Sequence, residues 1–188
     1  VNNDGRTASP VAPNLATQKA VMQAALERAG LSPSDVAHVE ANASGTELTD
    51  LLELKAIEAV YRGGSAQPCG LGSIKPNIGH PMSAEGIASL IKAALMLHHG
   101  RQVPFISGQA PMPHYDMSRS PLFFNRGLTP WTGPDRFVGI NSFGDGGTNV
   151  HAILGGWTQP EGVAIRRRPL APPPLARVDV RRPAATAV

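Results

Sequence analysis

The chain has 188 residues, of which 41% are hydrophobic, 16% charged and 5% aromatic, and this length suits one domain with a sizeable core. Its single cysteine excludes a disulfide framework and a cysteine-rich metal site, and no apolar run reaches the roughly 18 residues that a membrane span needs. No signal-peptide pattern opens the sequence. We therefore expect a soluble, cytoplasmic protein that binds no metal and does not associate with a membrane.

The formal net charge of +3 comes from the end of the chain. Residues 166–188 hold six arginines and one acid, whereas the remainder holds eleven basic and thirteen acidic residues. A basic tail of this kind is more often a solvated or docked linker than a nucleic-acid-binding arm. Because the remainder is net acidic and few aromatic residues are present for base stacking, we expect no nucleic-acid partner.

Helices and strands alternate in the first hundred residues. The predicted elements are a strand end at 1–5, a helix at 15–30, a strand at 36–41, a helix at 49–61, a strand at 69–75 and a helix after Ser83. Asn14 is predicted to cap the first helix and Gly30 to end it. Ser83 is predicted to cap the third. That helix carries the clearest apolar stripe of the chain, formed by Ile87, Leu90, Ile91, Ala94, Leu95 and His98.

After Gly100 the pattern changes to short strands between Pro and Gly residues. The candidates are 103–106, 122–125, 137–141 and 149–154. The whole order predicts an α/β fold, with a mixed sheet covered by helices. Pro, Arg and Ala dominate the end of the chain, so we expect a folded region at 1–155 and a Pro/Arg-rich linker or docking tail at 156–188.

Three polar clusters lie at predicted strand ends or helix starts, where loops commonly carry function. They span residues 40–46, 72–80 and 141–151. Taken singly, each has a structural explanation: the glycines at 144–147 suit a hairpin turn, His80 a turn and Lys75 the surface. A phosphate-binding loop is excluded, because no Lys-Ser/Thr pair follows the glycines.

Taken together, the clusters resemble the motifs of β-ketoacyl synthases. Residues 72–86 (GSIKPNIGHPMSAEG) are similar to the Lys and His motif, and 138–151 (VGINSFGDGGTNVH) to the C-terminal glycine loop. Residues 39–53 (VEANASGTELTDLLE) resemble the family motif VEAHGTGTxLGDPIE, and 120–131 (SPLFFNRGLTPW) fit modular polyketide synthases. The chain thus resembles the C-terminal half of a ketosynthase, which implies a thiolase-like fold.

The resemblance also implies roles for single residues. In the family, a Cys thiolate accepts an acyl chain from a carrier-protein thioester, and two histidines stabilise the enolate formed when a malonyl thioester loses CO2. His80 matches the second histidine, and Lys75 the ammonium that balances the charge of the site. The substrate-binding set that the resemblance implies is Thr46, Asn77, Phe143, Gly144, Gly146 and Gly147. No cofactor is expected, because the phosphopantetheine arm enters on the carrier protein.

Several positions depart from the family pattern. Asn42 stands where the family has its first histidine, and an amide can donate a hydrogen bond but cannot take a proton. Pro76 replaces the usual Thr, Met82 replaces the usual Glu, and Glu85 falls on a usual Ala. These departures predict a ketosynthase that transfers an acyl chain between carrier-protein thioesters without decarboxylative elongation.

The nucleophile of the family lies in its N-terminal half. Cys69 has no strand-to-helix elbow around it, so we expect a structural thiol there. The expected partners are therefore an N-terminal half that carries the Cys, an acyl carrier protein, and a second copy of the complete domain. An alternative is a catalytically silent partner, similar to a chain-length factor, that shapes the acyl tunnel of a competent ketosynthase. An active-site Cys in the other half would separate the two.

Overall fold

The computed structural model describes residues 1–156, with gaps at 8, 10, 63–67, 107–111 and 134–135. Apart from Gly156, the predicted tail at 156–188 lies outside the described residues and stays a prediction. The strands are β1 (Asn2–Asn3), β2 (Val36–Glu40), β3 (Cys69–Gly72), β4 (Arg101–Gln102), β5 (Leu122–Phe124), β6 (Thr129–Pro130), β7 (Phe137–Gly144) and β8 (Thr148–Gly155). The helices are α1 (Leu15–Ala29), α2 (Glu47–Tyr61), α3 (Lys75–Ile78) and α4 (Glu85–His99).

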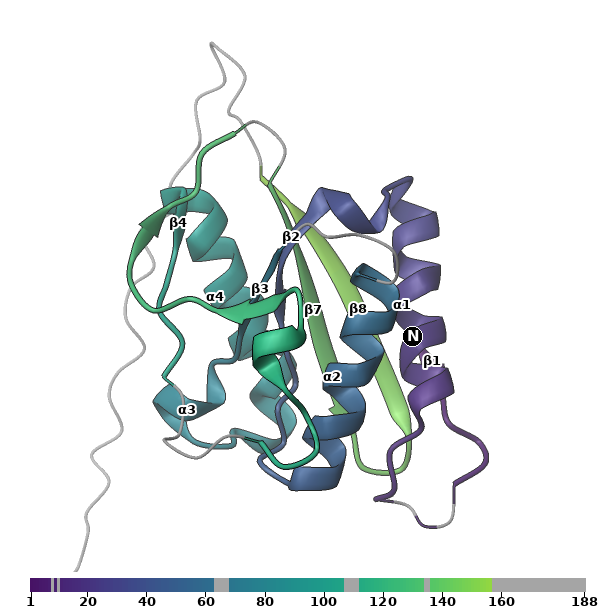
Figure 1. Cartoon of the computed structure of the whole chain (residues 1–188). Coiled ribbons are helices and arrows are strands. Elements are labelled where there is room, and N and C mark those ends of the chain that lie inside the picture. The colour runs from purple at the N-terminus through teal and green to yellow at the C-terminus, as the bar shows by residue number, and fades with distance from the viewer. Residues whose placement is uncertain (8, 10, 63–67, 107–111, 134–135, 157–188) are drawn as a thin grey trace, which may run out of the picture. The chain divides into compact units, whose positions relative to one another are not determined.

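The main sheet has the strand order β1-β8-β7-β2-β3-β5, and β4 pairs with β6 in a separate ladder. The two long strands β7 and β8 lie side by side in Figure 1. Strands β7, β2, β3 and β5 are parallel neighbours, whereas β8 runs antiparallel to β7 and β1 antiparallel to β8. The predicted α/β class with a mixed sheet is therefore confirmed. Among the helices that the structure describes, none has both the length and the apolar character of a membrane span.

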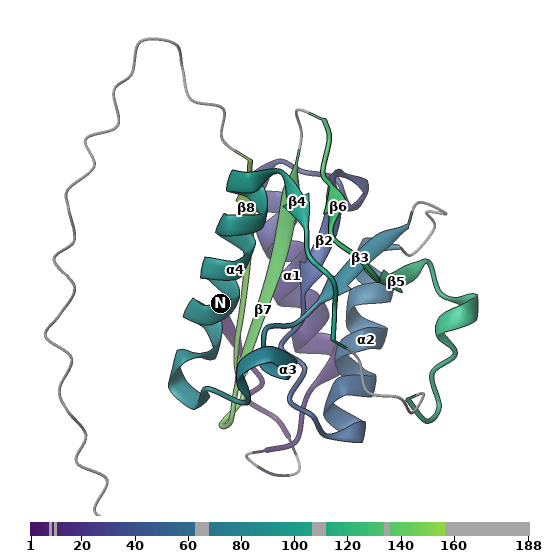
Figure 2. The ribbon, with the colours of Figure 1, turned by 90° about the vertical axis from the view of Figure 1, so that its left-hand side faces the viewer.

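Helices cover both faces of the sheet. Helices α1 and α2 lie on one face and α4 on the other (Figure 2). The core on the first face includes Met22, Ile57 and Leu71, all buried. The core on the second face joins Met96 of α4 to Ile140 of β7. Each face thus has an apolar cluster of its own, and the central strands contribute to both.

The first helix follows its local signals closely. The Asn14 side chain accepts hydrogen bonds from the amides of Ala16 and Thr17, and so caps the start of α1. Gly30 ends the helix with φ 64°, a left-handed conformation that glycine adopts without strain. Both predictions are confirmed.

Three predictions about individual elements are wrong. Strand β3 ends at Gly72, and Lys75 begins α3, because Pro76 suits the first turn of a helix and cannot donate to a strand ladder. Ser83 does not cap α4, since residues 82–84 form a 3₁₀ turn that leads directly into the helix. The predicted strand at 103–106 is absent from the described structure, where Arg101–Gln102 pairs instead.

Most of the apolar stripe predicted for α4 does not face the sheet, and Leu90 is the member that packs on the core there. Ile87, Ile91 and Leu95 are about half exposed, at 53%, 53% and 52%. The buried residues of α4 are Ser89, Ala93, Met96 and Leu97, and Leu90 of the stripe is partly buried against the same core cluster. This helix therefore has two apolar faces, and the chain buries only one of them.

Candidate active site

The candidate site lies where three neighbouring parallel strands end. Because β7, β2 and β3 run in the same direction, their carboxyl ends meet at one edge of the sheet. Asn42 follows β2, Lys75 follows β3, and Phe143 lies near the end of β7. The structure brings these three predicted residues into direct contact, and His80 joins them through Glu85.

Asn42 is held in one orientation. Its side chain is buried, and Oδ1 accepts from Lys75 Nζ at 3.3 Å and from the Phe143 amide at 3.1 Å. Two donors on one oxygen place the NH2 group on the opposite side of the amide. Within the described residues no group accepts from Asn42 Nδ2, so this residue presents its N–H to the site as a donor.

Lys75 and Glu85 form an ion pair in the same cluster. Their Nζ and Oε2 atoms lie 2.6 Å apart, and the side chains are only 9% and 12% exposed. The Ser142 hydroxyl contacts the other oxygen, Oε1, at 3.4 Å. Glu85 is the first residue of α4, where the helix dipole favours a carboxylate. Lys75 therefore has an anionic partner and an amide partner, and no further charge is needed to balance it.

His80 lies at the open side of the cluster, with 42% of its side chain exposed. Its Nδ1 accepts from the Met82 amide at 3.1 Å, so a neutral ring carries its proton on Nε2. Nε2 lies 3.5 Å from Glu85 Oε2, which is longer than a normal N–H···O hydrogen bond. The Nε2–H therefore remains available to an incoming carbonyl oxygen.

Glu53 is the principal residue of the site that sequence reasoning missed. This buried carboxylate accepts from the amides of Asn42 and Ala43 and from Asn141 Nδ2, at 2.7, 2.8 and 2.8 Å. Burial raises the pKa of Glu53, and the N–H donors oppose that rise. Ala43 has φ 44°, so Glu53 holds in place a backbone conformation that non-glycine residues disfavour.

A buried chain of side chains supports Glu53 from behind. Asn141 Oδ1 contacts His151 Nδ1 at 2.6 Å, and His151 Nε2 contacts the Tyr61 hydroxyl at 2.5 Å. Burial lowers the pKa of His151 to about 4 and raises the pKa of Tyr61. The ring is therefore neutral at pH 7, accepts from Tyr61 and donates to Asn141. This assignment leaves Asn141 Nδ2 free to donate to Glu53.

The sequence carried only weak signals for these further residues. Glu53 is an acid among the buried positions of α2, which otherwise include Ala56, Ile57 and Val60. Glu85 stood out as a departure from the family pattern, but nothing in the sequence placed it beside Lys75. Asn141 was visible only as part of the glycine-loop motif.

The remaining predicted residues lie outside this cluster. In the described structure no hydrogen bond joins Thr46 or Asn77 to Asn42, Lys75 or His80, although Thr46 lines a neighbouring cavity of about 1070 Å³. Of the predicted glycines, Gly146 and Gly147 have positive φ values of 88° and 82° in the turn between β7 and β8.

A Cβ on Gly147 would lie 2.8 Å from the Cβ of Asp4. Gly147 therefore allows the N-terminal segment to pack against the turn. The corresponding Cβ on Gly144 would meet only ordinary contact, at 3.9 Å from Thr148 O.

Cys69 is fully buried in β3, away from the cluster, and burial raises its pKa to about 11. A thiol of that pKa is almost wholly protonated at neutral pH, so Cys69 is unsuited to act as the nucleophile. The described residues hold no group of three or more His, Cys, Asp or Glu side chains arranged to bind a metal.

Comparison with known proteins gives consistent results. A family model described as "Beta-ketoacyl synthase, C-terminal domain" matches residues 1–109. Polyketide synthase PksL of Bacillus subtilis (strain 168) is 53% identical over 180 residues, which cover 96% of this chain and 4% of that protein. Spectinabilin polyketide synthase system protein NorA' of Streptomyces orinoci is 42% identical over 178 residues, covering 93% of this chain and 5% of that protein.

Solved structures show the same similarity. The oxazolomycin ketosynthase domain OzmH KS8 of Streptomyces albus JA3453 is 54% identical, with a TM-score of 0.81, over 93% of this chain and 46% of that chain. The ketosynthase from module 6 of the bacillaene synthase of Bacillus subtilis 168 is 33% identical, with a TM-score of 0.78, over 84% of this chain and 29% of that chain. This chain thus spans less than half of either solved ketosynthase and about a twentieth of the two curated proteins.

Proposed function

The chain belongs to the β-ketoacyl synthase family, as the C-terminal part of a polyketide synthase ketosynthase, and from this premise we propose that it serves acyl transfer between carrier-protein thioesters without decarboxylative elongation. The membership confirms the resemblance predicted from the sequence, including the thiolase-like fold. The finer assignment to a non-elongating enzyme depends on the geometry around Asn42.

Acyl transfer requires a nucleophile and stabilisation of one oxyanion. A cysteine thiolate, which we place in the N-terminal half, attacks the thioester carbonyl carbon, and the carbonyl π electrons move to oxygen. The tetrahedral intermediate then collapses and expels the pantetheine thiolate, which takes a proton from solvent. Only the developing oxyanion needs help from this chain, and N–H donors supply it.

Asn42 and His80 each offer such a donor. The observation that carries the proposal is the orientation of Asn42, whose Oδ1 is occupied by Lys75 Nζ and the Phe143 amide. Its Nδ2–H is thereby directed away from both, and His80 Nε2–H is likewise unoccupied by a short hydrogen bond. Because an amide cannot become cationic, Asn42 supports oxyanion binding but does not replace a histidine in decarboxylation.

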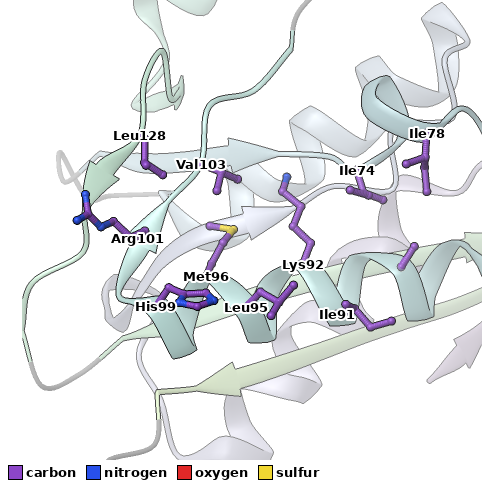
Figure 3. Close-up of a pocket in the computed structure, with 11 residues that line it drawn as sticks. Ile74, Ile78, Ile91, Lys92, Leu95, Met96, His99, Arg101, Val103 and Leu128 are labelled. Atoms are coloured by element: carbon purple, nitrogen blue, oxygen red, sulfur yellow. The ribbon is translucent and has the colours of Figure 1, made fainter. Parts of the chain in front are cut away.

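The exposed apolar face of α4 indicates that a partner covers this side of the sheet. An open cavity of about 910 Å³ lies between α4 and the segments that carry Ile74, Arg101 and Leu128. Figure 3 shows the side chains around this cavity. Its apolar lining includes Ile74, Ile78, Ile91, Leu95, Val103 and Leu128. Monomeric proteins rarely leave so many large apolar side chains together in water. We assign this face to the N-terminal half of the ketosynthase.

The test of this assignment is Ile91→Asp in the complete ketosynthase. If the N-terminal half covers the stripe, a buried carboxylate there lowers the unfolding midpoint in urea markedly. The matched control is Leu48→Asp, since Leu48 is a comparably exposed apolar residue on α2, at 61%. Equal, small effects of the two substitutions would contradict the assignment.

We further propose that an acyl carrier protein donates the acyl chain and that the complete domain forms a homodimer. No cofactor is required, because the phosphopantetheine arm arrives as part of the substrate. The chemistry is tested on the complete ketosynthase by intact-protein mass spectrometry, with an acyl pantetheine thioester as donor and malonyl carrier protein as the alternative substrate. We expect acyl loading on the N-terminal cysteine without CO2 release.

Release of CO2 at the rate of an elongating ketosynthase would overturn the proposal. Absence of any loading would instead favour a catalytically silent subunit, similar to a chain-length factor. The same spectra distinguish these outcomes, because loading and decarboxylation are followed in parallel.

A further inference from the structure

Two groups of the site could attract a negatively charged substrate, and one carboxylate already faces both. Lys75 Nζ lies 2.6 Å from Glu85 Oε2, and His80 Nε2 lies 3.5 Å from the same oxygen. Lys75 is the one Lys or Arg among the described side chains that contact Asn42 or Glu85. A carboxylate brought to either group therefore meets the negative charge of Glu85.

The surroundings of Glu85 leave it little freedom to move aside. Its other oxygen contacts the Ser142 hydroxyl, and its backbone begins α4. The next residue, Gly86, packs so closely on β7 that a Cβ there would lie 3.0 Å from Ser142 Oγ and 3.2 Å from Ser142 Cβ. Because the start of the helix is fixed against the strand, the carboxylate stays between Lys75 and His80.

The family position for an acid does not offer the same arrangement here. Met82 occupies that position, has φ 50°, and leaves 72% of its surface exposed. Its backbone N–H donates to His80 Nδ1. In this chain the carboxylate that contacts Lys75 is therefore supplied by position 85 and not by position 82.

We infer that Glu85 is a specificity-determining residue, which makes the site favour uncharged acyl thioesters over thioesters that carry a carboxylate, such as a malonyl group. This inference rests on the proposed function, because it takes His80 Nε2–H as a group that faces the substrate. An uncharged acyl chain can accept from His80 and Asn42 with no electrostatic cost. A malonyl carboxylate at the same place lies near a like charge in a partly buried environment, where repulsion is weakly screened.

The experiment compares two ligands that cannot undergo transfer. One is a malonyl pantetheine analogue with a methylene in place of the thioester sulfur, and the other is its methyl ester, which lacks the charge. Calorimetric titration of the complete ketosynthase yields the ratio of their dissociation constants. We expect the wild type to bind the ester roughly tenfold more tightly than the acid, and Glu85→Gln to remove most of this difference.

Two further variants separate charge from structure. Glu85→Asp keeps the carboxylate and should retain most of the preference for the ester, whereas Glu27→Gln, an exposed position on α1, should leave it unchanged. If Glu85 had a purely structural role, its substitution would weaken the binding of both ligands equally and leave the ratio of their dissociation constants unchanged. The ratio, rather than either affinity, therefore tests the inference.

Equal binding of the two ligands by the wild type would overturn the inference, and this holds even if Glu85→Gln does not fold. An unchanged ratio in a folded Glu85→Gln protein would overturn it as well. Neither result depends on acyl loading or CO2 release, so the failure of this inference is distinguishable from the failure of the proposed function.

Discussion

The two sides of the candidate site differ in how much of their structure the chain itself supplies. On the Glu53 side, the carboxylate, Asn42, Asn141 and His151 are all at most 6% exposed, and each is hydrogen-bonded within the chain. On the other side, His80 is 42% exposed. The Glu53 side is a closed framework that positions Asn42, whereas the His80 side is open at the surface of the chain. Substitutions on the two sides should therefore affect stability and activity differently.

The largest effect on stability is expected for Glu53→Ala. This change leaves two backbone amides and the Asn141 amide without their acceptor in a buried place, at a cost of about 4 kcal/mol in the free energy of unfolding. Urea unfolding of the complete ketosynthase measures it, with Glu27→Ala on the exposed surface of α1 as the control. A loss below about 1 kcal/mol would mean that Glu53 is not the centre of a closed framework.

Lys75→Ala and His80→Ala test the comparison directly. Loss of Lys75 leaves the carboxylate of Glu85 nearly buried without its cation, so we expect the free energy of unfolding to fall by about 3 kcal/mol.

His80→Ala removes a half-exposed side chain and should leave the fold intact. It should slow acyl loading modestly, by less than the roughly hundredfold that loss of an oxyanion donor costs when the donor is essential.

Urea unfolding and the rate of acyl loading, measured on the same two proteins, provide the test. Full-speed loading by His80→Ala would return this histidine to a structural role. A stable Lys75→Ala protein would show that Glu85 does not depend on the ion pair.

The buried histidine behind Glu53 predicts a pH dependence of stability. The pKa of His151 is about 4 in the folded chain and about 6.5 in the unfolded chain, so between these values the unfolded state binds more protons. The stabilising contribution is complete above pH 6.5 and is lost as the pH falls towards 4.

His151→Gln removes this titration. Between pH 7 and pH 4.5, the variant should lose about 2 kcal/mol less stability than the wild type. Unfolding curves at several pH values measure the difference. If the free energy of unfolding fell equally in the wild type and the variant, His151 would have to lie in a solvated environment.

The smallest effect is expected for Ala43→Gly. Ala43 has φ 44°, and glycine adopts such a conformation without the steric cost that a Cβ imposes. We expect a gain of about 0.5 kcal/mol in the free energy of unfolding, with acyl loading unchanged in rate. A loss of stability in urea unfolding would indicate that the methyl group contributes more by packing than it costs in backbone strain.

Local signals in the sequence were sufficient for much of the fold. Asn14 and Gly30 delimit α1 because capping depends on residues a few positions apart. The motif resemblance also singled out Asn42, Lys75 and His80, since family motifs are short and contiguous. The predicted boundaries were wrong near Pro76 and Ser83, where a short helix and a 3₁₀ turn replace the regular pattern.

Only the tertiary structure decided which groups meet. The pairing of Lys75 with Glu85, the support of Asn42 by Glu53 and the contact of Asn42 with the Phe143 amide join residues from separate elements. Which apolar face of α4 is buried was likewise undetermined, because both faces of that helix are hydrophobic and packing on β7 selects one. The sequence alone determined the family, the fold class and the residue types at the strand ends. How these side chains are oriented and how their charges are balanced depends on the sheet, because the sheet brings the ends of β2, β3 and β7 to one edge.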